Sequence, residues 1–408
     1  MNIVFRLLTI LGLILALTAC NSSDNIHGNR WSAPGVSDTE IRLGSSLALT
    51  GHAGYLGTQT LRGAEAYLRH VNDHGGIFGR KILVEAKDDF YDPPHCLANT
   101  QRFIIDNEVF ALFCYVGTPT TVKVLPLVEE AHIPLIGMFT GANALRQPFN
   151  RYVINIRASY YQETEATVRH LVEDLGIRRI AVFYQYDAYG FDGLIGTELA
   201  LKDFGIEPVA RGSYTRGTLD VEEGLERIRK SGAEAVVMVG TYGACARFIT
   251  LSHDKGYDPI FYNVSFVGAE ELARRIGPDS KATVLMSQVV PQPESTGTEE
   301  DSAAGQYVTL LKRYFPDDTP SFVGLEGYLN ARILVEGLKK AGPNLTREGF
   351  IDAIESIRDF KLGPGMSITY GPQDRQGLEQ VHFTRLDHGR FMPFSDWESL
   401  KGRQGDAQ

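Results

Sequence analysis

The chain has 408 residues, roughly two to three times the usual size of one domain, and 43% of them are apolar. It can therefore build at least two lobes, each with its own core. Lys and Arg number 40 against 50 Asp and Glu, which gives a formal charge of −10. This acidic balance offers no broad attraction for a phosphate backbone, so nucleic acid is excluded as an expected partner.

The start of the chain differs from everything after it. A basic start is followed by an almost wholly apolar run over residues 7–18, which is typical of an export signal. The run ends in Leu17-Thr18-Ala19-Cys20, which resembles the bacterial lipobox, where cleavage precedes a cysteine that carries the lipid. We expect residues 1–19 to be a signal peptide, Cys20 to be lipidated and residues 20–37 to be a flexible tether. An ordinary cleaved signal or a short uncleaved anchor is the alternative.

From residue 38 onward, short β-branched or apolar runs alternate with helical stretches, which predicts parallel sheets covered by helices. The expected strands of a first lobe are Ile41–Leu47, Lys81–Ala86, Val109–Cys114 and Ile133–Gly137, with a helix over Thr58–Asn72. The pattern restarts with strands over Ile180–Tyr184, Glu207–Ala210, Ala235–Gly240 and Ile260–Val264. Two such sheets leave a cleft at the carboxyl ends of their strands, where we expect a ligand.

The last hundred residues carry a different pattern. After a loop rich in Pro, Glu, Ser and Thr over residues 291–298, helices are expected over Ala303–Tyr314, Phe322–Lys340 and Thr346–Ser356. We expect these helices to return to the first lobe. Short strands joined by glycine-containing turns are then expected over Ser367–Tyr370, Gln380–Leu386 and Arg390–Pro393.

The chain lacks the sequence patterns of common catalytic sites. Gly-x-Ser-x-Gly, Gly-x-x-x-x-Gly-Lys-Ser/Thr and His-Glu-x-x-His are all missing, and the histidines do not cluster at metal-ligand spacing. We interpret Asp88 and Asp89 as stabilising a turn, because neighbours on a strand point to opposite faces and make a poor acid/base pair. We therefore expect no enzyme, no metal site and no cofactor.

Three cysteines remain beyond Cys20, and the sequence leaves their state open. If Cys96 lies on a helix and Cys114 on the strand that follows, the two can meet within one βαβ layer and form a disulfide in an oxidising compartment. The alternative is that Cys96, Cys114 and Cys245 are buried thiols that act as small apolar side chains.

A series of short motifs follows the chain from about residue 40 to 393. The most distinct are Gly51-His52-Ala53-Gly54-Tyr55-Leu56-Gly57, Asn72-Asp73-His74-Gly75-Gly76-Ile77-Phe78-Gly79-Arg80, Gly117-Thr118-Pro119-Thr120 and Gly240-Thr241-Tyr242. Their order and spacing resemble those of the type I periplasmic binding proteins, of which the branched-chain amino-acid (Leu/Ile/Val) receptors of ABC importers are the best-known members.

The resemblance implies an α/β fold with two Rossmann-like lobes, parallel sheets and an interlobe cleft. Lobe 1 would comprise residues 38–157 and 290–364, lobe 2 residues 158–289 and 365–398, with a tail over 399–408. A small polar ligand (amino acid, amide or carboxylate) would be held in the cleft and passed unaltered to an ABC permease in the inner membrane. The protein would be a monomer in the cell envelope, on the periplasmic side, anchored by its lipid. A receptor for signalling, or for activation of an envelope enzyme, is the alternative.

The resemblance also implies ligand contacts at the ends of the strands. In relatives, the loop after the third strand gives backbone N–H groups and a hydroxyl to the ligand carboxylate, which assigns Gly117 and Thr118 here. A plain helix cap is the alternative for Thr118. The next loop contributes Thr140. Tyr189 and Tyr242 would form aromatic walls.

Two further residues and the mouth of the cleft complete the expected site. Relatives that bind α-amino acids carry an acid after the strand over 260–264, whereas this chain has Ser265. Glu326 could take the place of that acid, and a solvated helix face is the alternative for it. Tyr55 would line the mouth. The ligand is then a carboxylate without an amino group, an amide, or an amino acid recognised differently.

Overall fold

The computed structural model describes residues 33–404, apart from residues 107, 294–301 and 364. The expected signal peptide, Cys20, residues 20–32 of the tether and most of the 291–298 loop lie outside the described residues. Within the described ranges, no helix is both long enough and apolar enough to span a membrane.

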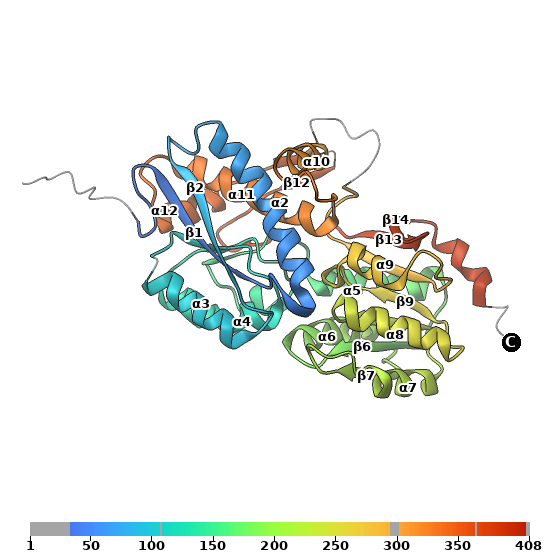
Figure 1. The fold of residues 1–408 in the computed structure, drawn as a ribbon. Coiled ribbons are helices and arrows are strands. Elements are labelled where there is room, and N and C mark those ends of the chain that lie inside the picture. Colours follow the sequence, from blue (N-terminus) through green and yellow to red (C-terminus); the bar gives the residue numbers. More distant parts are fainter. Residues whose placement is uncertain (1–32, 107, 294–301, 364, 405–408) are drawn as a thin grey trace, which may run out of the picture. The chain divides into compact units, whose positions relative to one another are not determined.

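The first lobe is built on a parallel five-stranded sheet with the order β2-β1-β3-β4-β5 (Figure 1). Its strands are β1 (Glu40–Leu47), β2 (Lys81–Asp88), β3 (Ala111–Phe113), β4 (Leu135–Ile136) and β5 (Val153–Ile154). One face is covered by α3 (Pro93–Ile105) and α4 (Thr118–Glu130), the other by α2 (Gly54–Asp73), α11 (Phe322–Ala341) and α12 (Arg347–Glu355). α10 (Ala303–Tyr314) packs against α2.

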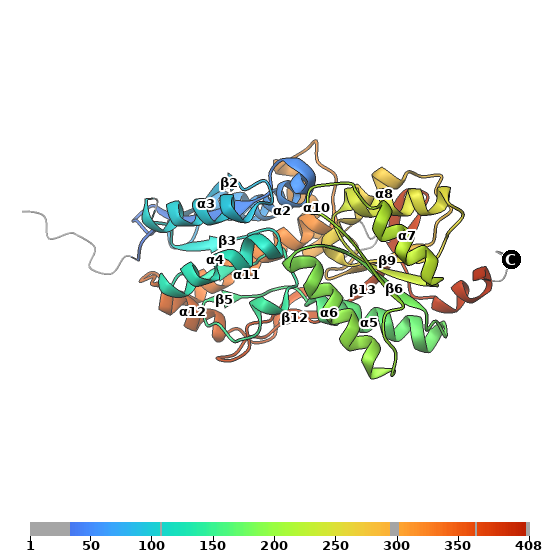
Figure 2. The ribbon, with the colours of Figure 1, turned by 90° about the horizontal axis from the view of Figure 1, so that it is seen from below.

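The second lobe is built on a seven-stranded sheet with the order β14-β13-β10-β9-β8-β6-β7. Its strands are β6 (Ile180–Gln185), β7 (Ala210–Tyr214), β8 (Ala235–Val239), β9 (Ile260–Asn263), β10 (Val284–Gln288), β13 (His382–Asp387) and β14 (Arg390–Pro393). The strands from β6 to β10 are parallel, and β13 and β14 add an antiparallel edge. One face carries α5 (Tyr160–Arg169) and α6 (Ala188–Asp203), the other α7 (Glu222–Ser231), α8 (Tyr242–Asp254) and α9 (Ala269–Ile276) (Figure 2).

The chain crosses between the lobes after β5, after β10 and after the hairpin of β11 (Phe360–Gly363) and β12 (Met366–Ile368). The expected boundary between the lobes in this last stretch lies at residue 364. Asn155 N donates to Arg375 O at 2.7 Å, and Tyr370 Oη donates to Asn155 O at 2.9 Å. Residues 370–375 thus bond to the crossing after β5, and β13 pairs with β10 in the second sheet.

Two short segments expected to be loose are part of the folded body. Arg42 N donates to Gly35 O at 2.8 Å, so residues 33–37 pack on the first lobe rather than belonging to a tether. The expected tail begins inside a 3₁₀ helix, η5 (Trp397–Gln404), whose Leu400 is buried. Long-range packing, which local composition does not reveal, holds residues 33–37 and η5 against the rest of the fold.

Most expected helices and strands are confirmed, with shifts of a few residues at their ends. The strand expected over Glu207–Ala210 is misplaced, because β7 occupies Ala210–Tyr214. Pro208 has no backbone N–H to give to a sheet, so the ladder begins after it. The sequence pattern did not predict β5, β10 or β11.

The Cys96–Cys114 disulfide, one of the two alternatives that the sequence left open, is not formed, since all three described cysteines are unpaired and buried. Cys114 faces α11, where Asn330 Nδ2 lies 3.7 Å from its sulfur. Its neighbour Tyr115 takes the α3 side of the sheet and bonds Thr100 at 2.8 Å, one turn from Cys96. The two sulfurs therefore lie on opposite faces, and the alternative of buried apolar thiols is the one observed.

Helices α2 and α11 touch through their backbones at glycines. A Cβ at Gly63 would lie 1.8 Å from Gly324 O, and a Cβ at Gly327 would lie 2.0 Å from Thr60 O. We expect Gly327→Ala to lower the free energy of unfolding by about 1–3 kcal/mol in urea titrations, because the helices must separate to admit a methyl group. The exposed Lys340→Ala on the same helix is the control and should change little. Equal losses in both variants would contradict this packing argument.

Candidate ligand-binding site

Loops from the carboxyl ends of both sheets meet between the lobes. The residues after β2, β3 and β4 come from the first sheet, and those after β6 and β9 come from the second. Direct hydrogen bonds join the two sides. Asn143 N donates to Asp192 Oδ1 at 2.9 Å, and Gln185 Nε2 donates to Tyr91 Oη at 3.4 Å. The lobes are thus in contact across this region.

Five buried rings from both lobes form what we call the aromatic cluster: Tyr91, Phe139, Tyr160, Tyr189 and Phe266. Phe266 lies at its centre, with its ring centroid 4.6 Å from that of Tyr189, 5.5 Å from Phe139, 5.9 Å from Tyr91 and 6.4 Å from Tyr160. Tyr91 and Phe139 belong to the first lobe, and the other three belong to the second. The cluster combines flat apolar faces with tyrosine hydroxyls.

A tight turn after β2 places Tyr91 in the cluster. Asp88 Oδ1 accepts from Phe90 N at 2.9 Å, and Asp89 Oδ1 accepts from Tyr91 N at 2.9 Å. These bonds hold Phe90 and Tyr91 at φ values of 56° and 60°, in the left-handed region. The interpretation of Asp88 and Asp89 as turn-stabilising residues is therefore confirmed.

The Tyr91 ring lies directly over Gly117. A Cβ at position 117 would fall 2.1 Å from Tyr91 Cε2, and the backbone there has φ of 100°. Only glycine meets both conditions. Gly117 was predicted to let a ligand approach the backbone. In the structure it lets the Tyr91 ring approach the backbone.

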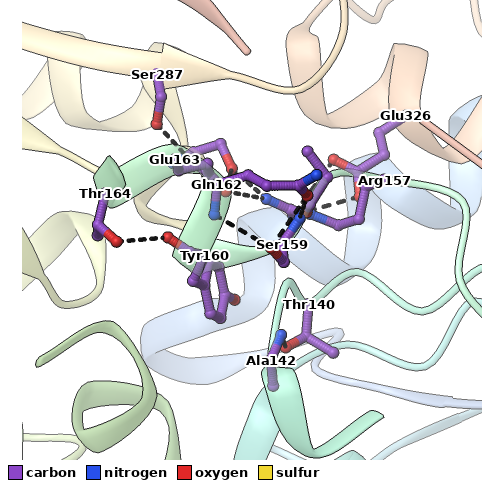
Figure 3. A network of polar contacts seen from close by, with 12 residues as sticks. Thr140, Ala142, Arg157, Ser159, Tyr160, Gln162, Glu163, Thr164, Ser287 and Glu326 are labelled. Atoms are coloured by element: carbon purple, nitrogen blue, oxygen red, sulfur yellow. Dashed lines mark hydrogen bonds and ion pairs between the residues drawn. The ribbon is translucent and has the colours of Figure 1, made fainter. Parts of the chain in front are cut away.

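A polar group of three hydroxyls lies beside the cluster, at the N-terminus of α4. Thr118 Oγ1 and Thr140 Oγ1 are 2.7 Å apart. Tyr160 N donates to Gly141 O at 2.9 Å, which brings the Tyr160 ring to the same loop (Figure 3). The Tyr160 hydroxyl is buried without a hydrogen-bond partner among the described residues, and burial raises the pKa of Tyr160, so it stays a donor.

Thr118 does not cap α4 with its side chain. Gly117 occupies the N-cap position, where no side-chain bond is made, and Thr118 is the first helical residue. The plain helix cap is therefore excluded as the reason for Thr118. The free N–H groups of the first turn and the helix dipole favour an anion at this end of α4.

A buried polar network joins the lobes next to the aromatic cluster (Figure 3). Arg157, in the crossing after β5, is only 1% exposed. Its Nη2 lies 2.8 Å from Glu163 Oε1 on α5, and its Nη1 lies 3.3 Å from Glu326 Oε1 on α11. Arg157 also donates to Ser265 Oγ, in the 3₁₀ helix η4 (Ser265–Val267). Glu163 Oε2 accepts from Ser265 N at 2.8 Å and from Ser287 Oγ.

The network and the aromatic cluster are in contact through Arg157. Its guanidinium carbon lies 5.3 Å from the Phe139 ring centroid and 5.5 Å from that of Tyr160, within cation–π range. Burial alone would lower the pKa of Arg157, but Glu326 and Glu163 hold it above its ordinary value. Burial raises the pKa of Glu326 to about 7, while Arg157 opposes that shift.

The expected site residues fall into two groups. Gly117, Thr118, Thr140 and Tyr189 lie at the aromatic cluster, and Ser265 and Glu326 lie in the polar network. Tyr189 Oη donates to Gly240 O at 3.1 Å, so its ring rather than its hydroxyl faces the cluster. Glu326 is buried against Arg157, which excludes the solvated helix face. That these residues contact a ligand stays a prediction.

Tyr55 and Tyr242 form a separate contact between the lobes. Their rings meet edge to face, with centroids 6.3 Å apart, and Tyr55 Oη donates to Glu270 Oε2 at 3.1 Å. Glu270 Oε1 in turn accepts from Phe322 N at 2.8 Å, at the N-terminus of α11. That Tyr55 lines the mouth of the cleft stays a prediction. For Tyr242 it means packing against Tyr55 rather than against the aromatic cluster.

Sequence reasoning missed Tyr91, Tyr160, Arg157 and Glu163. Arg157 and Tyr160 follow β5, whose two residues give no recognisable strand pattern. Tyr91 had a usable signal, because it comes five residues after the end of the expected strand Lys81–Ala86 and shortly after the acidic pair that stabilises the turn.

Two sheets whose strand ends face each other, with hydroxyls and rings between them, define a two-lobed α/β binding protein. The chain belongs to the periplasmic binding protein family, whose model matches residues 40–390. This is a family of solute-binding proteins, and membership implies a location outside the cytoplasm.

Several known proteins are similar over most of their length. A possible leucine/isoleucine/valine-binding protein from Rhodopirellula baltica SH 1 is 33% identical, with a TM-score of 0.84 over 90% of this chain and 100% of that one. A substrate-binding periplasmic protein from Ralstonia solanacearum is 26% identical, with a TM-score of 0.81 over 87% and 100%. The Leu/Ile/Val-binding protein homolog 7 of Brucella abortus is 24% identical over 76% of this chain and 79% of that protein.

Proposed function

We propose that this chain is the receptor of an ABC importer, and that it binds a small polar metabolite between its lobes and releases it unaltered. The supporting observation is the convergence of strand-end loops from both sheets on one polar group and one aromatic cluster. Thr118, Thr140 and the N-terminus of α4 can bind an anion through hydroxyl and amide groups. Such groups hold a ligand by hydrogen bonds and leave its covalent structure intact.

We further propose that Cys20 carries a lipid, that the mature protein is a monomer, and that a permease in the inner membrane receives the ligand. The apolar run over residues 7–18 and the Leu-Thr-Ala-Cys motif support the lipid anchor. Family membership supports the permease, because solute-binding proteins need a membrane partner to move the solute.

Native mass spectrometry of freshly purified protein and a thermal-shift screen with a broad metabolite panel test this proposal. We expect a bound small molecule, and a ligand at a hundredfold excess over its Kd should add about 3 kcal/mol of stability. Thr118→Val should weaken that stabilisation, whereas Thr309→Val on the exposed side of α10 should not. A protein that carries no small molecule and responds to no metabolite would refute the proposed function.

A further inference from the structure

Three carboxylates near the aromatic cluster, those of Glu163, Glu326 and Asp187, already have internal partners. Glu163 accepts from Ser265 and Ser287 and holds Arg157, while Glu326 holds the other side of the same guanidinium. Asp187, at the end of β6, accepts from Tyr189 N at 3.0 Å and also pairs with Arg216 at 3.4 Å. A ligand ammonium placed here would face Arg157 and compete with these bonds, which is costly for a buried cation.

The polar group at the N-terminus of α4 favours an anion rather than a cation. Its helix N-terminus attracts negative charge, and its hydroxyls are donors. The Tyr160 hydroxyl is the independent sign of a ligand, because it is fully buried, makes no hydrogen bond within the part of the chain that the structure describes, and comes from a ring directed at the loop of Thr140 (Figure 3). An acceptor atom placed between Tyr160, Thr118 and Thr140 would satisfy it.

The aromatic cluster supplies the apolar wall for the rest of a ligand. The contacts of Tyr91 and Phe139 with Phe266 cross from one lobe to the other. When the lobes open about their crossings, these ring faces separate and can cover the flat body of a ligand.

We propose that the ligand is a monocarboxylate with a flat or ring-bearing apolar body and without an ammonium group. The inference rests on the proposed function, since it specifies the ligand of the same site. The carboxylate lies at the N-terminus of α4, where Tyr160 donates to it, and the apolar body lies in the aromatic cluster. Glu163 and Glu326 both pair with Arg157, so a cationic ligand would have to displace a guanidinium that is already bound to them.

Isothermal titration of the purified protein with matched pairs of ligands tests the charge preference. The pairs are 3-phenylpropionate against L-phenylalanine and 4-methylpentanoate against L-leucine, which differ only in the α-ammonium group. We expect each acid to bind at least tenfold more tightly than its amino-acid partner, and 3-phenylpropionate more tightly than 4-methylpentanoate. Equal or reversed preference within the pairs overturns the inference. Binding restricted to an uncharged metabolite also overturns it but leaves the proposed function standing, whereas no binding of any small molecule overturns both.

Tyr160→Phe tests the position of the carboxylate. Because the hydroxyl has no hydrogen-bond partner among residues 33–404 as described, its removal should leave the thermal midpoint unchanged and weaken binding of the acid about tenfold. Tyr307→Phe is the matched control, a buried tyrosine whose hydroxyl accepts from Ser321 N at 3.2 Å outside the cluster. It should lower the midpoint and leave the affinity unchanged. Unchanged affinity in Tyr160→Phe would overturn the placement.

Discussion

Replacing Arg157 by methionine is expected to lower the free energy of unfolding by about 3–5 kcal/mol, the cost of removing one partner from a buried ion pair. The guanidinium is the shared counter-ion of Glu163 and Glu326, and all three side chains are almost fully buried. Without it, two carboxylates face each other in a site closed to water. Denaturant unfolding followed by circular dichroism at pH 8, above the value of about 7 to which burial raises the pKa of Glu326 in the unchanged chain, measures the loss.

An exposed ion pair provides the comparison. Arg169 lies 2.9 Å from Glu165, and both side chains are more than half exposed. Arg169→Met should therefore cost less than about 1 kcal/mol. A variant that changes Arg157, Glu163 and Glu326 together to Met, Gln and Leu should regain most of the loss, because no buried charge remains. If Arg157→Met cost no more than Arg169→Met, the polar network would not be what holds this region together.

The fold could be predicted in large part because buried parallel strands appear as continuous apolar runs separated by helical stretches. β1, β2, β6 and β8 were located this way. β5 could not be located, because a strand of two residues is too short to show a hydrophobic pattern. It is recognised only by its pairing with β4. The lobe boundary after β12 depends on bonds between Asn155 and residues near 375, which are some 200 positions apart.

The site could be predicted only where it follows directly from a strand end. Gly117, Thr118 and Thr140 follow β3 and β4, where the resemblance to relatives placed the ligand contacts. The partners of Arg157 lie 6, 108 and 169 positions away along the chain, on separate elements. No local sequence pattern reveals that these residues contact one another. Glu326 was therefore expected to bind a ligand, whereas it already pairs with Arg157.

The stability of the chain relative to Glu326→Gln is expected to fall as the pH rises from about 5 to 8. Burial raises the pKa of Glu326 to about 7 against an ordinary value of 4.5, with Arg157 opposing the shift and Glu163 adding to it. Between these two values the folded state keeps a proton that the unfolded state has lost. Stability is therefore full below the lower value and is lost progressively toward the upper one, by up to about 3 kcal/mol.

Denaturant unfolding of both proteins at pH 5, 6, 7 and 8 gives the difference curve, in which Glu165→Gln, an exposed change, should show no such slope. A flat curve for Glu326→Gln would mean that attraction to Arg157 outweighs burial and keeps Glu326 charged throughout. The two network variants are then linked. Arg157 is the cation that opposes protonation of Glu326, so Arg157→Met should raise the pKa of Glu326 further. The loss of stability caused by Arg157→Met should therefore be smaller at pH 5 than at pH 8.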